Sequence, residues 1–204
     1  GGVAGDSTIL IDKAISMNLN NIAVGSIWDP VAVSLCFAAG EKANVDLRFG
    51  GKVSSSGGSP INKRVLVKKI VRNAFQSFGE SFVPMGDSVC IAFDGIEVIL
   101  NSNRSQTFST DLFTELGVNI SNKKILIIKS TNHFYNSFFP HVSTIIYASV
   151  DGIYPNNPKK NKYTKLKRKI YVSNYLYLHF CNQNGYNCRI LYFTIIGSES
   201  GSFL

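Results

Sequence analysis

The 204-residue sequence is poor in cysteine and histidine, and both shortages limit what the chain can do. No Cys-x-x-Cys pair and no regular framework connects its four cysteines, which are Cys36, Cys90, Cys181 and Cys188. In a chain of this size such spacing is typical of reduced thiols rather than of a disulfide scaffold. We therefore expect a cytoplasmic protein.

The three histidines are equally scattered. His133, His141 and His179 form neither an HxH nor an HExxH pattern, and Pro140 separates the first two. A catalytic zinc site uses about three protein ligands and an open position. The sequence shows no such set, so we expect this chain to bind no metal or other cofactor.

Long apolar runs are also missing. The polar residues 182–185 interrupt the last apolar stretch well before the roughly 18 residues that a membrane span requires, so we expect no membrane partner. The chain opens on Gly1 without a methionine, and no apolar signal-peptide core follows. We expect a piece of a longer protein, or a reading frame that starts late.

Acidic residues are scarce, which leaves a net charge of +8. Seven basic residues and no acid fall within residues 159–169, so the remainder of the chain carries 8 − 7 = +1. A nucleic-acid-binding protein spreads its basic residues over a binding face. We interpret the tract as a solvated connection and expect no nucleic-acid partner.

What the sequence does contain is a globular core, since 45% of its residues are hydrophobic. We assign residues 1–172 to one domain. Residues 173–204 are rich in Tyr and Asn and form no recognisable capped element, so we expect a poorly ordered tail or one loose hairpin about Gly185.

Helices and strands alternate along the domain. Asp6-Ser7-Thr8 predicts a helix start, Asp29-Pro30 predicts a second one that Gly40 ends, and Asp94-Gly95 predicts a tight hairpin turn. We predict helices at 6–18, 29–40 and 111–116, strands at 21–27, 44–49, 64–72, 87–93, 96–101, 125–128 and 143–148, and an irregular loop at 73–85. The pattern predicts an α/β fold with a mixed sheet and flanking helices, with α+β as the alternative.

The most informative stretch is residues 123–135, where an apolar strand ends in a polar cluster and a helical segment follows. In open α/β sheets ligands bind at this position, because backbone N–H groups and hydroxyls converge there. We predict a substrate-binding group of Ser130, Thr131, Asn132 and His133. Asn132 and His133 would donate hydrogen bonds to a substrate carbonyl or carboxylate. A capped helix with a surface histidine is the alternative.

Four further residues are candidate substrate ligands, and each also has a purely structural interpretation. Asp29 either faces a cleft or only caps its helix. Lys52, on a Gly-Gly loop, either meets a substrate carboxylate or is solvated. Arg104 and Gln106 either clamp a carboxylate or cap a loop.

The opening segment is rich in glycine. Asp6 and Ser7 would cap the first helix, and a carboxylate at Asp6 would repel phosphate. Gly1, Gly2, Gly5 and Asp6 are predicted to face a partner domain, because glycines let the backbone pass close to it.

Six short blocks, in order, resemble one family. They are Gly1–Thr8, 25–33, 49–52, 103–106, 111–113 and 129–135. Together they are similar to the C-terminal region of the MlrC proteins, the microcystinase C group of M81 metallopeptidases, over about residues 1–172.

The resemblance implies a hydrolase that cuts amide bonds in small peptides. In that family an N-terminal domain carries the zinc ligands and the catalytic carboxylate, so this chain would be the substrate-framing part, inactive alone and partnered by the missing domain. No catalytic residue is assigned in this chain, and the substrate stays open. The alternative is a non-enzymatic binding module that has kept only the fold.

Overall fold

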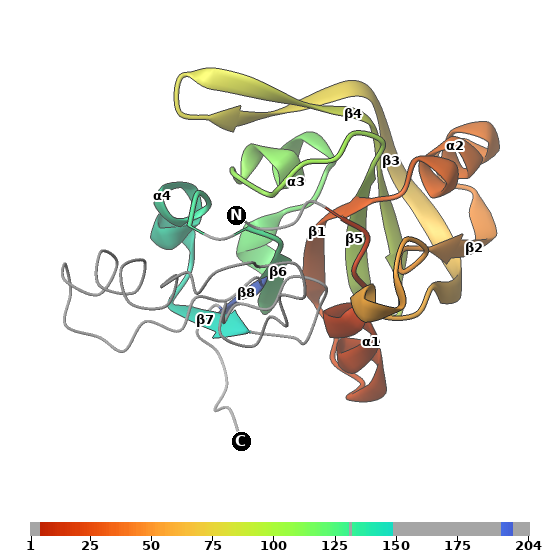
Figure 1. Ribbon diagram of the computed structural model, residues 1–204, viewed down its shortest axis with the longest axis horizontal. Coiled ribbons are helices and arrows are strands. Elements are labelled where there is room, and N and C mark those ends of the chain that lie inside the picture. The colour runs from red at the N-terminus through yellow and green to blue at the C-terminus, as the bar shows by residue number, and fades with distance from the viewer. Residues whose placement is uncertain (1–4, 131, 149–192, 198–204) are drawn as a thin grey trace, which may run out of the picture.

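The computed structural model describes residues 5–130, 132–148 and 193–197. Among these residues eight strands form one sheet in the order β2-β3-β4-β5-β1-β6-β8-β7 (Figure 1). In chain order the strands are β1 Ile22–Trp28, β2 Asn44–Phe49, β3 Ile61–Phe78, β4 Ser81–Phe93, β5 Ile96–Asn101, β6 Ile125–Ile128, β7 Thr144–Ala148 and β8 Phe193–Gly197.

The sheet is mixed, as predicted. Strand β1 runs parallel to both of its neighbours, β5 and β6. The other pairings are antiparallel. Three parallel strands therefore lie at the centre of the described sheet, flanked by antiparallel strands on both sides.

Helices cover both faces of the sheet. The helices are α1 Ile9–Ser16, α2 Pro30–Ala39, α3 Asp111–Glu115 and α4 Tyr135–Phe138, with short 3-10 turns at Ser55–Gly57, Ile120–Asn122 and Phe139–His141. Apolar side chains of α1 and α2 pack on one face of the central strands. Those of α3 and α4 pack on the other face. The fold is α/β, as the sequence predicted.

Successive side chains of β1 point to opposite faces of the sheet, and both faces are covered by helices, so the strand is buried on both sides. Ile22 and Val24 face α1 and α2, whereas Ala23 faces α3 and α4. At Gly25 an added Cβ would lie 2.8 Å from the Phe113 ring. Glycine therefore lets helix α3 approach the sheet closely.

Two local predictions are confirmed in detail. Asp29 is the N-cap of α2 and its carboxylate accepts a hydrogen bond from Ala32 N, with Pro30 at the first helical position. Strands β4 and β5 are joined at Asp94 and Gly95, whose φ angles of 46° and 74° fit a type I′ turn.

The predicted irregular loop over residues 73–85 is wrong. This segment is the outer half of a long β3–β4 hairpin that extends past α3 (Figure 1). Its polar residues bond to a distant segment: Gln76 Nε2 donates to Ser105 Oγ at 2.9 Å, and Ser77 N donates to Asp111 Oδ2 at 2.8 Å. Because these partners are 29 and 34 residues away, local sequence did not indicate them.

The segment after β6 also differs from the prediction. Helix α4 begins at Tyr135 with Phe134 as N-cap and no side-chain capping bond, so His133 precedes the helix instead of lying in its first turn. Residues 193–197, predicted to belong to the tail, form β8 between β6 and β7. The remaining tail residues lie outside the described residues, and their predicted disorder stays a prediction.

None of the helices in the described part of the chain is long and apolar enough to cross a membrane.

Candidate functional site

The carboxyl ends of the three parallel strands lie side by side. Strands β5, β1 and β6 end at Asn101, Trp28 and Ile128, at one edge of the sheet. Ligands of open α/β sheets bind at this edge. The segments that follow these strands carry the predicted candidates Asp29, Arg104, Gln106 and residues 130–133.

Asp29 is buried, and both of its carboxylate oxygens are occupied. Its exposure is 4%, Oδ1 accepts from Ala32 N at 3.0 Å and Oδ2 accepts from Gly50 N at 2.9 Å. The Lys52 ammonium lies 3.0 Å from Oδ1 and 2.8 Å from Oδ2. Asp29 thus caps α2, holds the loop after β2 and pairs with Lys52, so two of the predicted ligands bind each other.

Asp6 binds the same loop from the other side. Its Oδ2 accepts from Lys52 N at 2.6 Å and from Val53 N at 2.9 Å, and its backbone carbonyl accepts from Gly51 N at 2.6 Å. Gly51 has φ +58°, and an added Cβ would lie 2.5 Å from the Ser59 backbone. The Gly-Gly pair is therefore required for this loop to close over Asp6.

The predicted capping of α1 by Asp6 and Ser7 is wrong. The N-cap is Thr8, which makes no side-chain bond to the helix, and its hydroxyl donates to Ser59 O at 2.7 Å instead. The Asp6 carboxylate has the more favourable partners, because two backbone N–H groups of the Lys52 loop converge on one oxygen.

Gly5 connects the opening segment to two of the central strands. Its carbonyl accepts from Trp28 N at 3.1 Å and from the Lys129 ammonium. Gly1 and Gly2 lie outside the described residues. The predicted domain-facing role of this segment stays a prediction.

Arg104 and Gln106 leave the end of β5 in different directions. The Arg104 guanidinium lies 4.1 Å from the centroid of the Trp28 ring, and the indole N–H donates to Ser102 O at 2.8 Å. Ser130 Oγ donates to Gln106 Oε1 at 3.5 Å, a long and therefore weak hydrogen bond. Arg104 is exposed on its aromatic support, whereas Gln106 is half-buried.

The group after β6 is divided by burial. Ser130 is fully buried, whereas Asn132 and His133 are exposed. Thr131 lies outside the described residues. Only Asn132 and His133 among the described members therefore present their side chains to solvent.

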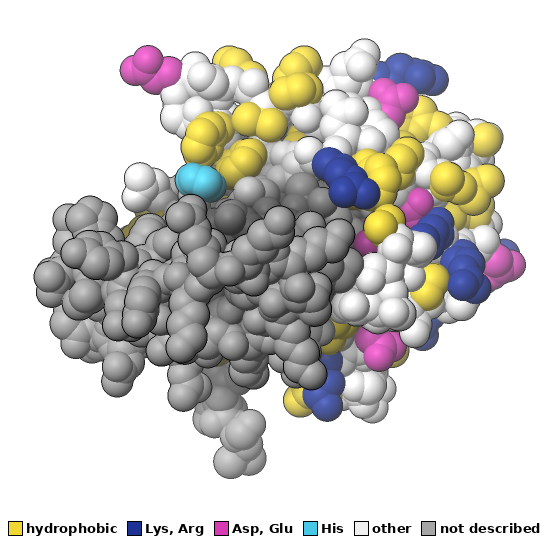
Figure 2. Space-filling model, viewed as in Figure 1, with side chains coloured by type: hydrophobic (Ala, Val, Ile, Leu, Met, Phe, Trp, Pro, Cys, Tyr) yellow, Lys and Arg dark blue, Asp and Glu magenta, His cyan; other side chains and the backbone are white. Residues whose placement is uncertain are grey.

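His133 packs in an aromatic cluster with the outer end of the β3–β4 hairpin. Its ring is edge-on to Phe78 at 5.1 Å and to Phe108 at 5.7 Å between centroids. Phe78 and Phe82 are 43% and 73% exposed, and Figure 2 shows hydrophobic side chains gathered over this end of the hairpin. The hairpin thus supplies an apolar wall beside His133, which sequence reasoning missed.

Lys129, also missed, is the first residue after β6. Its exposure is 4%, its backbone N–H donates to Gly25 O at 3.1 Å, and its ammonium donates to Gly5 O. Burial lowers the pKa of Lys129 from 10.5 to about 7, against the attraction of the Asp6 carboxylate and together with the repulsion of Arg104. The position of a lysine directly after a buried strand could have marked Lys129 as a candidate site residue. The sequence does not reveal that its ammonium is buried.

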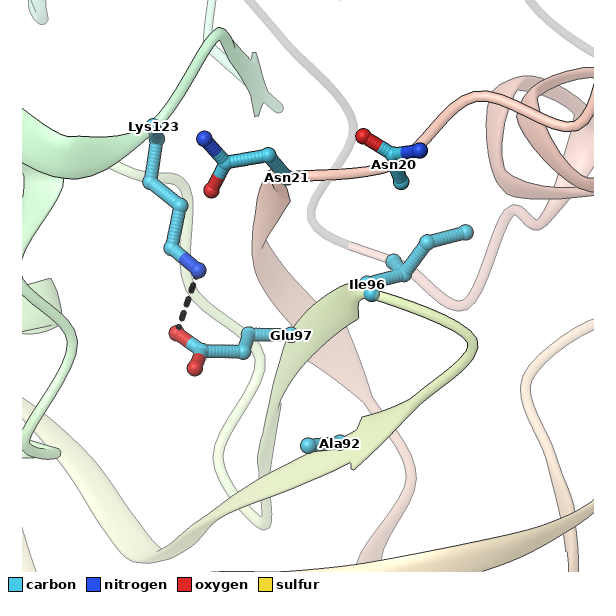
Figure 3. Close-up of a pocket in the computed structure, with 7 residues that line it drawn as sticks. Asn20, Asn21, Ala92, Ile96, Glu97 and Lys123 are labelled. Carbon is cyan, nitrogen blue, oxygen red and sulfur yellow. Dashed lines mark ion pairs between the residues drawn. The ribbon is translucent and has the colours of Figure 1, made fainter.

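The opposite end of the sheet has a shallow recess of about 340 Å³ at the start of β5 (Figure 3). Glu97 lines it, and the Lys123 ammonium lies 3.0 Å from Glu97 Oε2. Lys68 pairs with the other oxygen of Glu97. Burial would raise the pKa of Glu97, but the hydrogen bonds from both lysines lower it. This recess lies away from the predicted site residues.

The described residues do not fit a zinc site. No group of three or more His, Cys, Asp or Glu side chains in the described ranges is arranged to hold a metal. The Asp6 and Asp29 carboxylates are committed to backbone N–H groups and to Lys52. Burial, followed by the charge of Asp29, raises the pKa of the Cys36 thiol to about 11.

Comparison with known proteins agrees with the fold. A family model described as MlrC C-terminus matches residues 1–165. Microcystinase C from Sphingomonas sp. is 34% identical over 149 residues, covering 73% of this chain and 29% of that protein. A crystal structure named "Putative metallopeptidase", from Mesorhizobium sp. BNC1, has a TM-score of 0.72 at 23% identity and shows the same fold over 83% of this chain and 34% of its own. This chain thus spans a minor part of both relatives, and it belongs to the MlrC C-terminal family.

Proposed function

We propose that this chain is the substrate-framing part of an MlrC-like metallohydrolase that cuts amide bonds of small peptides. In this model of the reaction the zinc ligands and the catalytic carboxylate belong to a partner domain outside these residues, and we expect the chain to be inactive alone. Membership of the family supports the reaction class. The free, buried thiols of Cys36 and Cys90 are compatible with the cytoplasm as the proposed compartment.

One observation carries the framing role. The parallel strands β5, β1 and β6 bring segments that are far apart in sequence to one edge of the sheet. There Asn132, His133 and Arg104 have exposed side chains that can donate hydrogen bonds. Donors that follow neighbouring strands of one sheet are placed together and can orient a peptide.

The predicted residues take two kinds of role in this proposal. Asn132 and His133 contact a substrate carbonyl, and Arg104 contacts a carboxylate. Asp29 and Lys52, which pair with each other, hold the loop that borders the site. Buried Ser130 and half-buried Gln106 support the turn after β6. Thr131 remains a proposed substrate ligand. The segment Gly1, Gly2, Gly5 and Asp6 faces the metal-bearing domain.

A non-enzymatic binding module is the second candidate. The Asp6 and Asp29 carboxylates are both bound within the fold, so this chain offers neither as a catalytic base, an observation that fits both candidates. Both candidates share the same substrate-facing edge, and turnover separates them.

The test uses a complete, metal-bearing relative, in which the residue aligned with His133 is replaced by alanine. We expect kcat/KM to fall about tenfold or more at unchanged zinc content, because a donor to the reacting carbonyl is lost. Substitution at the position aligned with exposed Lys124 is the matched control. Unchanged turnover in the His133 variant would reject the substrate contact.

The division of labour has its own measurement. Metal analysis of the purified 204-residue chain should find no stoichiometric zinc after incubation and desalting. Tightly held zinc at one equivalent would overturn the assignment of the metal to a partner domain.

A further inference from the structure

At the carboxyl ends of the parallel strands, the acidic side chains have direct partners, whereas two basic side chains have no carboxylate partner among the described residues. Asp29 is neutralised by Lys52, and Asp6 binds backbone N–H groups. Arg104 and Lys129 form no ion pair with a carboxylate in the described part of the chain. Within the described ranges, two cations at this edge thus have no carboxylate bound directly to them.

Lys129 is the more unusual of the two. An ammonium has three N–H donors, and its acceptor here is the neutral carbonyl of Gly5. A buried ammonium without a counter-ion is costly unless it is paired or deprotonated. Within the described residues the ammonium has this carbonyl as its direct hydrogen-bond acceptor, so an anion would be a more favourable partner for it.

Arg104 lies near Lys129 through a short chain of contacts. Trp28 N and the Lys129 ammonium both donate to the Gly5 carbonyl, which brings the end of β1 close to Lys129. Arg104 stacks on the Trp28 ring at 4.1 Å. A guanidinium that lies over an aromatic face can still donate from its N–H fork to an anion.

We propose that Lys129 and Arg104 form a subsite for a carboxylate group of the peptide substrate. The carboxylate first meets exposed Arg104 and then accepts a hydrogen bond from the Lys129 ammonium. This subsite rests on the proposed function for the identity of its ligand, because a peptide offers a terminal or side-chain carboxylate.

The surrounding charges set the selectivity. Asp6 attracts the Lys129 ammonium and Arg104 repels it. Lys52 is already bound to Asp29 on the neighbouring loop. A carboxylate between Lys129 and Arg104 removes their mutual repulsion, whereas a neutral amide does not.

The test is a binding titration with the purified 204-residue chain. The probes are N-acetylalanine, which carries a carboxylate, and N-acetylalanine amide, which does not. We expect saturable NMR shifts at the Lys129 side-chain methylene and at Arg104 Nε, with a dissociation constant of roughly 1–10 mM for the carboxylate. The amide should produce no saturable shift.

Variants assign the effect to the two side chains. Lys129→Met and Arg104→Gln should each weaken carboxylate binding about tenfold, whereas Lys129→Arg should retain most of it. Lys124→Met, at an exposed position before β6, is the control and should bind as the unmodified chain does. Should Lys129→Met fail to fold, Arg104→Gln and Lys129→Arg decide the question.

Two results would overturn the subsite. Equal binding of the carboxylate and amide probes would exclude charge recognition, and unchanged binding in Arg104→Gln would exclude the pair. The two hypotheses can fail separately. If the His133 variant of a complete relative loses turnover but the 204-residue chain binds no carboxylate, the subsite is rejected and the proposed hydrolase function stands. If the 204-residue chain binds the carboxylate but turnover of the His133 variant is unchanged, the substrate contact of His133 is rejected and the subsite stands.

Discussion

The two ends of the central strands differ in how their charged side chains are paired. At the amino end, Glu97 lies between the ammonium groups of Lys68 and Lys123. At the carboxyl end, Lys129 is 4% exposed and donates to the neutral carbonyl of Gly5. The Glu97 carboxylate is directly paired with two cations. In the described part of the chain the Lys129 ammonium has a neutral carbonyl as its direct acceptor and the Asp6 carboxylate only as a charge that attracts it, so its burial is compensated less well. Ionisable groups with strongly shifted pKa values cluster at functional sites.

The largest expected difference between the ends is the pH dependence due to Lys129. Burial holds its pKa near 7 instead of 10.5, so between these values the unfolded chain binds more protons than the folded one. Stability therefore rises with pH across this window, and the full cost applies below pH 7. Lys129→Met removes the cost, and its advantage over the unmodified chain should shrink by about 3 kcal/mol from pH 6 to pH 9.

Urea unfolding of both proteins at the two pH values measures this effect. Comparing the two chains cancels the contribution of Cys36, whose raised pKa of about 11 would lower stability above pH 9. Lys124→Met should show no such slope. A pH-independent difference for Lys129→Met would place the ammonium in water.

The second effect tests the amino end. Glu97→Gln leaves Lys68 and Lys123 without their shared carboxylate, and we expect a loss of about 2–3 kcal/mol at pH 7. The figure is below that of a fully buried pair, because the Lys68 side chain is 32% exposed.

Chemical denaturation measures this loss, and acid provides a check on its origin. Because the pKa of Glu97 is lowered, its contribution is present above the unfolded pKa and is lost as pH falls through the folded pKa. The penalty of Glu97→Gln should therefore decrease in acid. Equal penalties at pH 7 and in acid would show that packing, not charge, is responsible.

A smaller effect is expected where a carboxylate serves as a structural acceptor. Asp29→Asn keeps an oxygen for Ala32 N but turns an NH₂ group toward Gly50 N and Lys52, donors that need an acceptor. We expect a loss of about 2 kcal/mol, measured by urea unfolding. A loss below about 0.5 kcal/mol would show that the loop rearranges around the amide.

The smallest expected effect comes from an exposed ion pair, which serves as the reference for the buried groups. Asp46 lies 3.4 Å from Arg64, and their side chains are 79% and 69% exposed. Asp46→Asn should change stability by no more than about 0.5 kcal/mol, because water screens exposed pairs. A thermal melt within experimental error of the unmodified chain is the expected result.

The same contrast between local and distant partners explains which predictions succeeded. The cap at Asp29-Pro30 and the turn at Asp94-Gly95 depend on residues within a few positions, and both are present. The loop predicted at 73–85 failed, because Gln76 finds its partners at Ser105 and beyond.

The candidate site shows the same division. The sequence predicted a ligand site after the strand at 125–128 and named Asp29 and Arg104 separately; the structure places all three segments at the carboxyl ends of neighbouring parallel strands, an arrangement that the sequence did not indicate. Sequence did not reveal that Lys52 binds Asp29, or that Asp6 binds the Lys52 loop instead of capping α1. Those pairings join residues 23 and 46 positions apart.

The amino-acid order by itself determined the mixed α/β architecture, the Asp29-Pro30 start of α2, the tight turn and the resemblance to the MlrC family, because periodicity and turn chemistry act over a few residues. Only the tertiary structure decided which charges meet. It gave Glu97 two ammonium partners and left Lys129 beside a carbonyl, because burial and ion pairing depend on how distant strands are aligned in the sheet.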